Sequence, residues 1–295
     1  MDFETIKLEH QGVLDRARSQ GEQTTADAGF VNLWLWRFAR KIEIASLGDE
    51  GGAVFVKQTL PSGEIFFLAP IGGEMAKNLA GLKDYARKAD IALNFRAVTE
   101  EQKQAISAAC PDEFSFTHDR DHSDYLYKVS DMISLAGRPY HSKKNFINRY
   151  ETFYGINYER LNAKNFYEAI SFIDRWFQRA EYAAEAEKLG ILSLIENFDR
   201  FKLSCGLLRA EDQIAALTVG EKLSDDRVVI HIEKADGANF SGSYQTINQV
   251  HLAQEYADFS IVNREEDLGL EGLRKAKLSY HPFALADKYR AFCTN

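Results

Sequence analysis

The sequence predicts an α+β protein of two tandem lobes, each a mixed, mainly antiparallel sheet with helices on both faces. Each half of the chain contains three consecutive strand candidates joined by short turns, which is typical of antiparallel pairing. A helix long enough for a crossover follows in each half, and it leads to a further strand that can pair in parallel. Gly137 and Pro139 interrupt the pattern, so we expect the lobes to span residues 1–135 and 136–295.

The first lobe is expected to begin with two helices, at 8–18 and 25–38, in which apolar residues recur at helical spacing. Thr99, with Gln102 three residues later, predicts a capping box at the start of a later helix. The remaining elements in chain order are strands 41–47, 52–58 and 64–69, helix 74–89, strand 91–97, helix 99–109 and strands 114–118 and 124–129.

The second lobe is expected to begin with a basic helix over 142–154, whose apolar face would consist of Phe146, Tyr150 and Phe153. The elements that follow are strand 157–161, helices 164–180 and 184–198, strands 203–209, 213–221 and 227–233, helix 243–257, strand 259–263 and helix 269–278. A last extended segment completes the chain.

The composition is that of a soluble globular protein, with 45% hydrophobic and 27% charged residues. No apolar run approaches the roughly 20 residues that span a bilayer, and the N-terminus lacks the features of a signal peptide. We therefore expect a cytoplasmic protein without an integral membrane segment. Cys110, Cys205 and Cys293 are scattered, which predicts neither a disulfide framework nor a metal site.

The net charge of −8 disfavours a dedicated nucleic-acid binder. Residues 132–150 nevertheless contain four cationic side chains and no acid, which makes a local basic patch in an acidic protein. The patch is either a solvated helix face or a surface that meets a polyanion. The residues that would make this contact are His141, Lys143, Lys144 and Arg149.

Polar side chains gather where two strands of the second lobe end. Glu233 and Lys234 close strand 227–233, and residues 263–267 follow the next strand that can pair with it. Ligands favour the crevice at the carboxyl ends of parallel strands. The start of helix 243–257, with Gly242 before it, would add backbone N–H groups that favour an anion. The alternative is that Ser241 or Ser243 is simply an N-cap and Gly242 a turn residue.

Three consecutive acids, Glu265, Glu266 and Asp267, directly follow Arg264. Carboxylates this close raise one another's pKa unless cations compensate, and Arg274 and Lys277 lie nearby on the next predicted helix. One interpretation is an ion-pair network that ties strand to helix. The other is a substrate-binding wall, whose carboxylates hold an amine or act as a general base and whose cations hold an anionic group.

The predicted order of elements resembles the Gcn5-related N-acetyltransferase (GNAT) fold in tandem. The segments 137–149, 233–236, 242–248 and 263–277 resemble the signature of a bacterial family related to the C-terminal catalytic domain of phosphatidylglycerol lysyltransferases. Relatives with known activity move an aminoacyl group from a charged tRNA to a lipid headgroup. The resemblance implies an aminoacyl-tRNA or an acyl-CoA as donor substrate, and it covers essentially the whole chain.

A conventional coenzyme A site does not match the sequence. GNAT enzymes usually hold the pyrophosphate with a loop of the form Arg/Gln-x-x-Gly-x-Gly/Ala after the fourth strand. In the corresponding stretch, 234–243, Gly237 and Gly242 are too far apart and Asp236 would repel a phosphate. An acetyl-CoA-dependent N-acyltransferase with a degenerate loop therefore stays the alternative hypothesis, beside a non-catalytic module that binds a small molecule.

The leading hypothesis is an acyl- or aminoacyltransferase in which an amine, an amino acid or a hydroxyl compound attacks an activated ester. The second lobe would carry the active site. The candidate catalytic residues are Glu233, Tyr244, Glu265, Glu266 and Asp267. The candidate substrate-binding residues are Lys234, Asn248, Asn263, Arg264, Arg274 and Lys277. The oligomeric state does not follow from the sequence.

Overall fold

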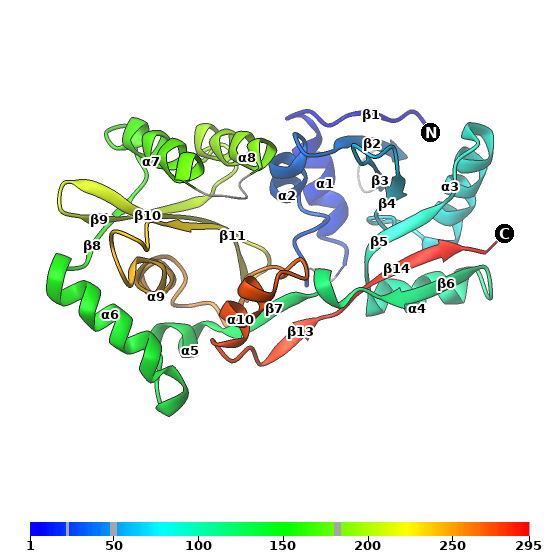
Figure 1. Ribbon diagram of the computed structural model, residues 1–295. Helices are drawn as coiled ribbons and strands as arrows, with labels where there is room; N and C mark the ends of the chain where they lie inside the picture. Colours follow the sequence, from blue (N-terminus) through cyan, green and yellow to red (C-terminus); the bar gives the residue numbers. More distant parts are fainter. Residues whose placement is uncertain (22–23, 48–51, 180–183, 295) are drawn as a thin grey trace. The chain divides into compact units, whose positions relative to one another are not determined.

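The computed structural model describes residues 1–21, 24–47, 52–179 and 184–294. The chain divides into two compact units, one formed by 1–124 together with 286–295 and the other by 125–285. Within these described ranges each unit contains one seven-stranded mixed sheet with helices (Figure 1). This division differs from the predicted cut after residue 135 in two ways. The boundary lies earlier, at residue 124, and the C-terminal residues 286–295 belong to the first unit.

The first unit contains helices that match the predicted ones, with α2 shorter than expected because the chain turns before Gly29. Its helices are α1 (His10–Arg18), α2 (Phe30–Trp36), α3 (Met75–Ala89) and α4 (Glu100–Ala109). Its strands are β1 (Glu4–Thr5), β2 (Lys41–Leu47), β3 (Ala53–Thr59), β4 (Ile65–Phe67), β5 (Asn94–Thr99), β6 (Phe114–His118) and β14 (Lys288–Cys293). Their order across the sheet is β1-β2-β3-β4-β5-β14-β6.

The capping box at the start of α4 is confirmed. The Gln102 backbone N–H donates to Thr99 Oγ1 at 3.2 Å, and the Thr99 backbone N–H donates to Gln102 Oε1 at 3.0 Å. This exchange satisfies two backbone donors that a helix start would otherwise leave unpaired. The helix then packs Ile106 into the apolar core that Leu82 of α3 also enters.

The C-terminal strand β14 completes the sheet of the first unit. It pairs antiparallel with β5 on one side and with β6 on the other. Lys288, at its start, is 1% exposed, and its Nζ lies 2.7 Å from Asp124 Oδ1 and 2.6 Å from Asp27 Oδ2. A buried ammonium needs such partners, because an unpaired charge in the protein interior costs several kcal/mol.

The second unit has the predicted elements and one helix, α5, that was not expected. Its sheet also includes β7, the strand predicted over 124–129 to close the first lobe, because β7 pairs with β12. Its helices are α5 (Val129–Ser134), α6 (His141–Tyr154), α7 (Phe166–Arg179), α8 (Glu185–Glu196), α9 (Ser243–Glu255) and α10 (Glu271–Leu278). Its strands are β7 (Asp124–Lys128), β8 (Asn157–Arg160), β9 (Ser204–Ala210), β10 (Gln213–Lys222), β11 (Arg227–Ala235), β12 (Ile261–Asn263) and β13 (Ala284–Ala286). The predicted end of the α7 helix, residue 180, lies outside the described residues.

The sheet of the second unit has the order β13-β7-β12-β11-β10-β9-β8. Helices α7 and α8 cover one face, and α9 lies on the other with α5 and α6 beside it (Figure 1). The only parallel pair that the described register gives for this sheet is β11 with β12, from Arg227↔Ile261 to Val229↔Asn263. β11 continues to Ala235 beyond that pairing, so the two strands part where the polar residues begin.

A register shift in β11 decides which way the polar residues point. Val219 pairs with Ile232 and Gly220 with Ile230, so His231 is passed over as the extra residue of a bulge. Ile230 packs with residues of α9, and Ala235, an odd number of positions later, also packs with α9. In an unbroken strand, residues 230, 232 and 234 would face α9 and Glu233 would face the other side of the sheet. Because of the bulge, Glu233 faces α9 instead.

The apolar face predicted for α6 is wrong in two of its three residues. Tyr150 is buried as expected, but Phe146 and Phe153 are 39% and 71% exposed. The buried stripe instead runs through Ile147 and Tyr150, three residues apart, because this is the side that packs against α9.

Candidate functional site

Glu233 is the centre of a polar cluster on the α9 face of the second sheet. Its Oε2 accepts a hydrogen bond from Asn248 Nδ2 on α9 at 2.9 Å. Its Oε1 accepts one from Arg264 Nη2, just past the end of β12, also at 2.9 Å. Three segments that are apart in the sequence are thus joined by one carboxylate, and they are three that the sequence predicts as site segments.

The guanidinium of Arg264 lies between two aromatic rings. Its Cζ is 5.0 Å from the ring centre of Tyr280 and 5.8 Å from that of Tyr127. Burial alone would lower the pKa of Arg264, but the Glu233 carboxylate and the two phenols outweigh it and raise that pKa. Arg264 is therefore a permanent cation in a partly desolvated position, where its interactions are stronger than in water.

Two buried polar atoms of this cluster lack a hydrogen-bond partner within the described parts of the chain. One is Arg264 Nη1, a donor, and the other is Asn248 Oδ1, an acceptor. A carboxylate only accepts, so Asn248 must present its amide N–H₂ to Glu233 and its oxygen away from it. A buried unsatisfied group costs about 1–3 kcal/mol, which a ligand carrying both an acceptor and a donor would recover.

The loop after β12 is held in an unusual conformation by its own polar groups. Glu265 has φ +56° and Leu268 φ +54°, in the left-handed region that few non-glycine residues adopt. Asn263 stabilises the first of these, since its Oδ1 accepts from the Glu265 backbone N–H at 2.7 Å. Lys277 Nζ donates to the carbonyl oxygens of Arg264 and Glu265 and fixes the loop from the α10 side.

Asp267 is fully buried in this loop and is held on all sides. Arg274 donates to it through Nε and Nη2, each at 2.8 Å, the Tyr125 hydroxyl donates at 2.5 Å, and the Gly269 backbone N–H donates at 2.9 Å. The Arg274 hydrogen bonds, followed by those of Tyr125 and Gly269, lower the pKa of Asp267 well below its usual range. These contacts hold the loop in place through Asp267 and Arg274. Glu266 lies half-buried in the same loop.

A second carboxylate cluster surrounds the bulge residue His231. Its Nδ1 lies 2.7 Å from Glu265 Oε1 and its Nε2 lies 3.0 Å from Glu221 Oε1. Burial alone would lower the pKa of His231, but the hydrogen bonds to Glu221 and Glu265 outweigh it and raise that pKa to about 10. The imidazolium therefore ties the site loop to β10 and β11 at neutral pH, and Glu265 is occupied by this contact.

The His231 cluster predicts a pH-dependent stability. Because the folded-state pKa lies above the unfolded value near 6.5, the stabilisation is complete below about pH 6.5. It is lost as the pH rises toward 10. We expect the free energy of unfolding of the native protein to fall by a few kcal/mol across this range, at about 1.4 kcal/mol per pKa unit. Urea denaturation at pH 6, 8 and 9.5 measures it. His231→Gln is the control and should lack this slope; an equal slope in both proteins would contradict the assignment.

Lys234 and Tyr244 are candidate residues outside the hydrogen bonds of Glu233 described above. Lys234 points to the opposite face of the sheet, where its Nζ lies 2.8 Å from Glu187 Oε1 and 4.1 Å from the ring centre of Trp176. Tyr244, in the first turn of α9, is half-buried, and burial raises its pKa, with the carboxylates of Glu233 and Asp236 acting in the same direction.

The predicted polyanion-binding residues of α6 divide into two groups. Lys143 is directed inward, since its Nζ donates to Ser279 Oγ at 2.6 Å and lies 4.3 Å from the ring centre of Tyr280. Burial lowers the pKa of Lys143, and the nearby charge of Arg264 adds to this. Lys144 is half-buried, and His141 and Arg149 are exposed. Lys143 therefore lies next to Tyr280 and Arg264, at the edge of the Glu233 cluster.

The start of α9 is closed on the side of α6. Gly242 has φ +95°, and a Cβ placed on it would lie 2.4 Å from the Phe146 carbonyl oxygen. Only glycine satisfies both constraints. The N-terminus of α9 is thus packed against backbone.

Some residues of the cluster were not expected from the sequence. Tyr127 and Tyr280 flank Arg264, and Glu221 holds His231, yet each looks like an ordinary strand or loop residue in the sequence.

Across the described ranges, His, Cys, Asp and Glu side chains form no group of three or more that would hold a metal ion. Every described helix is too short or too polar to cross a bilayer.

Comparison with known proteins supports the sequence-based resemblance. Residues 18–292 match the family described as phosphatidylglycerol lysyltransferase, C-terminal. An uncharacterised protein of Mycoplasmoides gallisepticum, MYCGA3080, is 26% identical over 175 residues, which are 57% of this chain and 55% of that protein. The chain therefore spans about half the length of this curated relative.

Solved structures confirm the predicted fold. A conserved protein of unknown function from Bacteroides thetaiotaomicron superposes with a TM-score of 0.91 at 28% identity, covering 100% of both chains. L-PGS from Bacillus licheniformis superposes with a TM-score of 0.70 at 14% identity, covering 99% of this chain and 93% of that one. A tandem GNAT protein from clavulanic acid biosynthesis shares the fold at a TM-score of 0.54 and 11% identity, covering 98% of both chains.

Proposed function

We propose, from the premise that the chain belongs to the family of the phosphatidylglycerol lysyltransferase C-terminal domain, that it transfers an aminoacyl group at the Glu233 cluster. The observation that carries this proposal is the pair of unsatisfied buried atoms, Arg264 Nη1 and Asn248 Oδ1, on either side of Glu233. An aminoacyl ester has a carbonyl oxygen that accepts and a neighbouring ammonium that donates. It therefore complements both atoms with adjacent groups.

The reaction assigns a distinct role to each residue of the cluster. An amine or hydroxyl of the acceptor attacks the acyl carbon, which forms the new C–N or C–O bond, and the ester C–O bond to the donor then breaks. Arg264 Nη1 donates to the carbonyl oxygen as negative charge develops there. Glu233, whose oxygens each have a second lone pair, takes the proton of the nucleophile and returns it to the leaving oxygen. Asn248 Oδ1 orients the ammonium.

The surroundings of the cluster fit this assignment. Tyr127 and Tyr280 keep Arg264 in place and exclude water on two sides. The loop tied by Asn263, Asp267, Arg274 and Lys277 holds the Arg264 backbone, so the guanidinium is preorganised, and preorganised donors need no rearrangement during the reaction. The predicted tRNA contact of α6 then rests on His141, Lys144 and Arg149, because Lys143 faces Tyr280.

Calorimetric titration of the full chain with two probes tests the proposal. The first probe is a stable lysyl-adenosine amide, in which an amide replaces the ester of an aminoacyl-tRNA end, and the second is acetyl-CoA. We expect the amide to bind. Glu233→Gln should weaken it about ten-fold or more, because the charged hydrogen bonds that orient Asn248 and Arg264 toward the ligand, of about 1.5–3 kcal/mol each, are lost.

The matched control is Glu187→Gln, which removes a carboxylate on the opposite face of β11 and should leave the affinity unchanged. The proposal would be overturned if acetyl-CoA bound to the protein while the amide neither bound nor displaced it. That result would favour the acyl-CoA alternative.

A further inference from the structure

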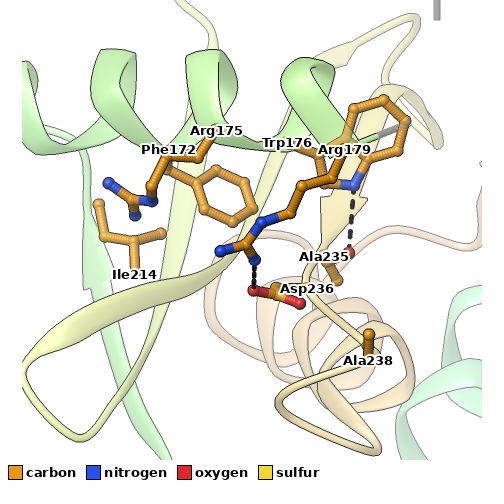
Figure 2. Close-up of a pocket in the computed structure, with 9 residues that line it drawn as sticks. Phe172, Arg175, Trp176, Arg179, Ile214, Ala235, Asp236 and Ala238 are labelled. Atoms are coloured by element: carbon orange, nitrogen blue, oxygen red, sulfur yellow. Dashed lines mark hydrogen bonds and ion pairs between the residues drawn. The ribbon is translucent and has the colours of Figure 1, made fainter. Parts of the chain in front are cut away.

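A pocket on the other face of the second sheet is separate from the Glu233 cluster. It has a volume of about 190 Å³ and lies between α7 and the segment that joins β11 to α9 (Figure 2). One wall carries Phe172 and Trp176, one helical turn apart on α7. The opposite wall is the backbone from Ala235 to Ala238. The Trp176 indole N–H donates to the Ala235 carbonyl oxygen at 3.1 Å, which holds the two walls together.

Two arginines of α7 border the pocket, and they are not equivalent. Arg179 is neutralised, because its Nη1 lies 2.6 Å from Asp236 Oδ2 across the pocket (Figure 2). Arg175 also lines the pocket, and the ion pairs and hydrogen bonds among the described residues include none for its guanidinium. The pocket therefore combines a mainly apolar interior with one net positive charge at its rim.

We infer that this pocket binds a small organic anion with a flat apolar body. Its volume is below the roughly 300–1,000 Å³ of drug-sized sites, so the body is a single ring or a short branched chain. The ring would lie against Phe172 and Trp176, where aromatic contacts are favourable. The carboxylate or phosphate of the ligand would pair with Arg175, whose planar fork of N–H donors matches either group.

Asp236 gives the pocket its selectivity. Its carboxylate lies inside the lining and is committed to Arg179 and to the Asn239 side chain at 2.8 Å. The Arg179–Asp236 pair leaves no net charge at its end of the pocket, so the anionic group of a ligand is held at the Arg175 end. A cationic amine, in contrast, would meet the unpaired charge of Arg175. The pocket thus takes an anion in one orientation.

Ligand-observed NMR titration of the full chain tests this inference with three probes: phenyl phosphate, phenylacetate and the neutral phenylacetamide. We expect at least one anion to bind at least ten-fold more tightly than the amide, and the stronger anion tells whether the site prefers phosphate or carboxylate. Arg175→Gln should reduce that affinity about ten-fold. The control is Arg200→Gln, an exposed arginine just after α8, and it should change nothing.

A second variant guards against indirect effects of Arg175→Gln. Ala238→Trp places a large ring at the rim of the pocket and should abolish binding of every probe, while circular dichroism shows that the fold is kept. Equal affinity for the anions and the amide, or an Arg175→Gln variant that binds like the native protein, would overturn the inference. Neither outcome depends on acyl transfer at Glu233.

Discussion

Deletion of residues 286–295 is expected to prevent the first unit from folding. β14 is an interior strand of that sheet, paired on one side with β5 and on the other with β6. Its removal exposes both neighbours, opens the core around Ala291, and leaves Asp124 buried without Lys288. The loss should exceed the 5–15 kcal/mol by which a domain is typically stable. The expected result is a chain that is insoluble or has lost one cooperative unfolding transition.

The substitution Lys288→Met measures how much the ion pair contributes to stability while the strand β14 is kept. Breaking a buried pair by removing one partner typically costs about 3–5 kcal/mol, and Asp124 is fully buried here. Lys7→Met is the control, because Lys7 is exposed in its contact with Glu4 and such surface pairs contribute at most about 1 kcal/mol. Urea denaturation followed by circular dichroism compares the two. A Lys288→Met protein within 1 kcal/mol of the native chain would show that the strand does not depend on this pair.

Replacement of Arg264 by glutamine is expected to slow aminoacyl transfer by about 10²–10³-fold, the effect of losing one oxyanion donor. Glutamine keeps a polar group near Glu233 but removes the charge that stabilises the developing oxyanion. The initial rate of aminoacyl-ester consumption by the full chain measures the effect. Arg209→Gln is the matched control, since Arg209 also forms ion pairs on a strand of the same sheet, with Glu159 and Glu168, and its rate should not change.

A loss of rate in Arg264→Gln could also arise from unfolding, because Glu233 would be left with an uncompensated charge. The double variant Glu233→Gln with Arg264→Gln removes both charges and should regain most of the stability. It should stay as inactive as the single variant. If a folded Arg264→Gln protein keeps the native rate, Arg264 is not the oxyanion donor and the proposed centre is wrong.

The predicted helices and strands agree with the structure where the signal is local. Apolar periodicity predicts most elements to within a few residues, and Thr99 with Gln102 predicts a capping box that the structure contains. The Glu233, Asn248 and Arg264 cluster could also be anticipated. Two strand ends and a helix side chain meet because the carboxyl ends of parallel strands share one edge of a sheet.

The features that the sequence did not predict depend on contacts between distant residues. The return of β14 to the first sheet has no local signature, since a strand does not encode its partner. The bulge at His231 changes the direction of Glu233 by one residue, and a strand pattern does not reveal it. The apolar face of α6 was misplaced because both candidate stripes, through Phe146 or through Ile147, have helical spacing.

The acidic run from Glu265 to Asp267 shows the limit most clearly. Charge and position predict either an ion-pair network or a substrate wall, and the residue types fit both. Only the tertiary structure shows that Asp267 is held by Arg274 and Tyr125, that Glu265 contacts His231, and that Arg264 donates to Glu233.

The elements, the tandem mixed-sheet architecture, the family and the segments from which a site could be built are all predictable from the amino-acid sequence. Those properties follow from local periodicity and from motif spacing, which every short stretch of the chain carries. The tertiary structure shows which charged side chains are engaged in ion pairs and hydrogen bonds within the fold, and which polar atoms have no hydrogen-bond partner among the described residues. This distinction depends on burial and on partners far along the chain, and it separates Arg264, Asn248 and Glu233 from the other polar residues around them.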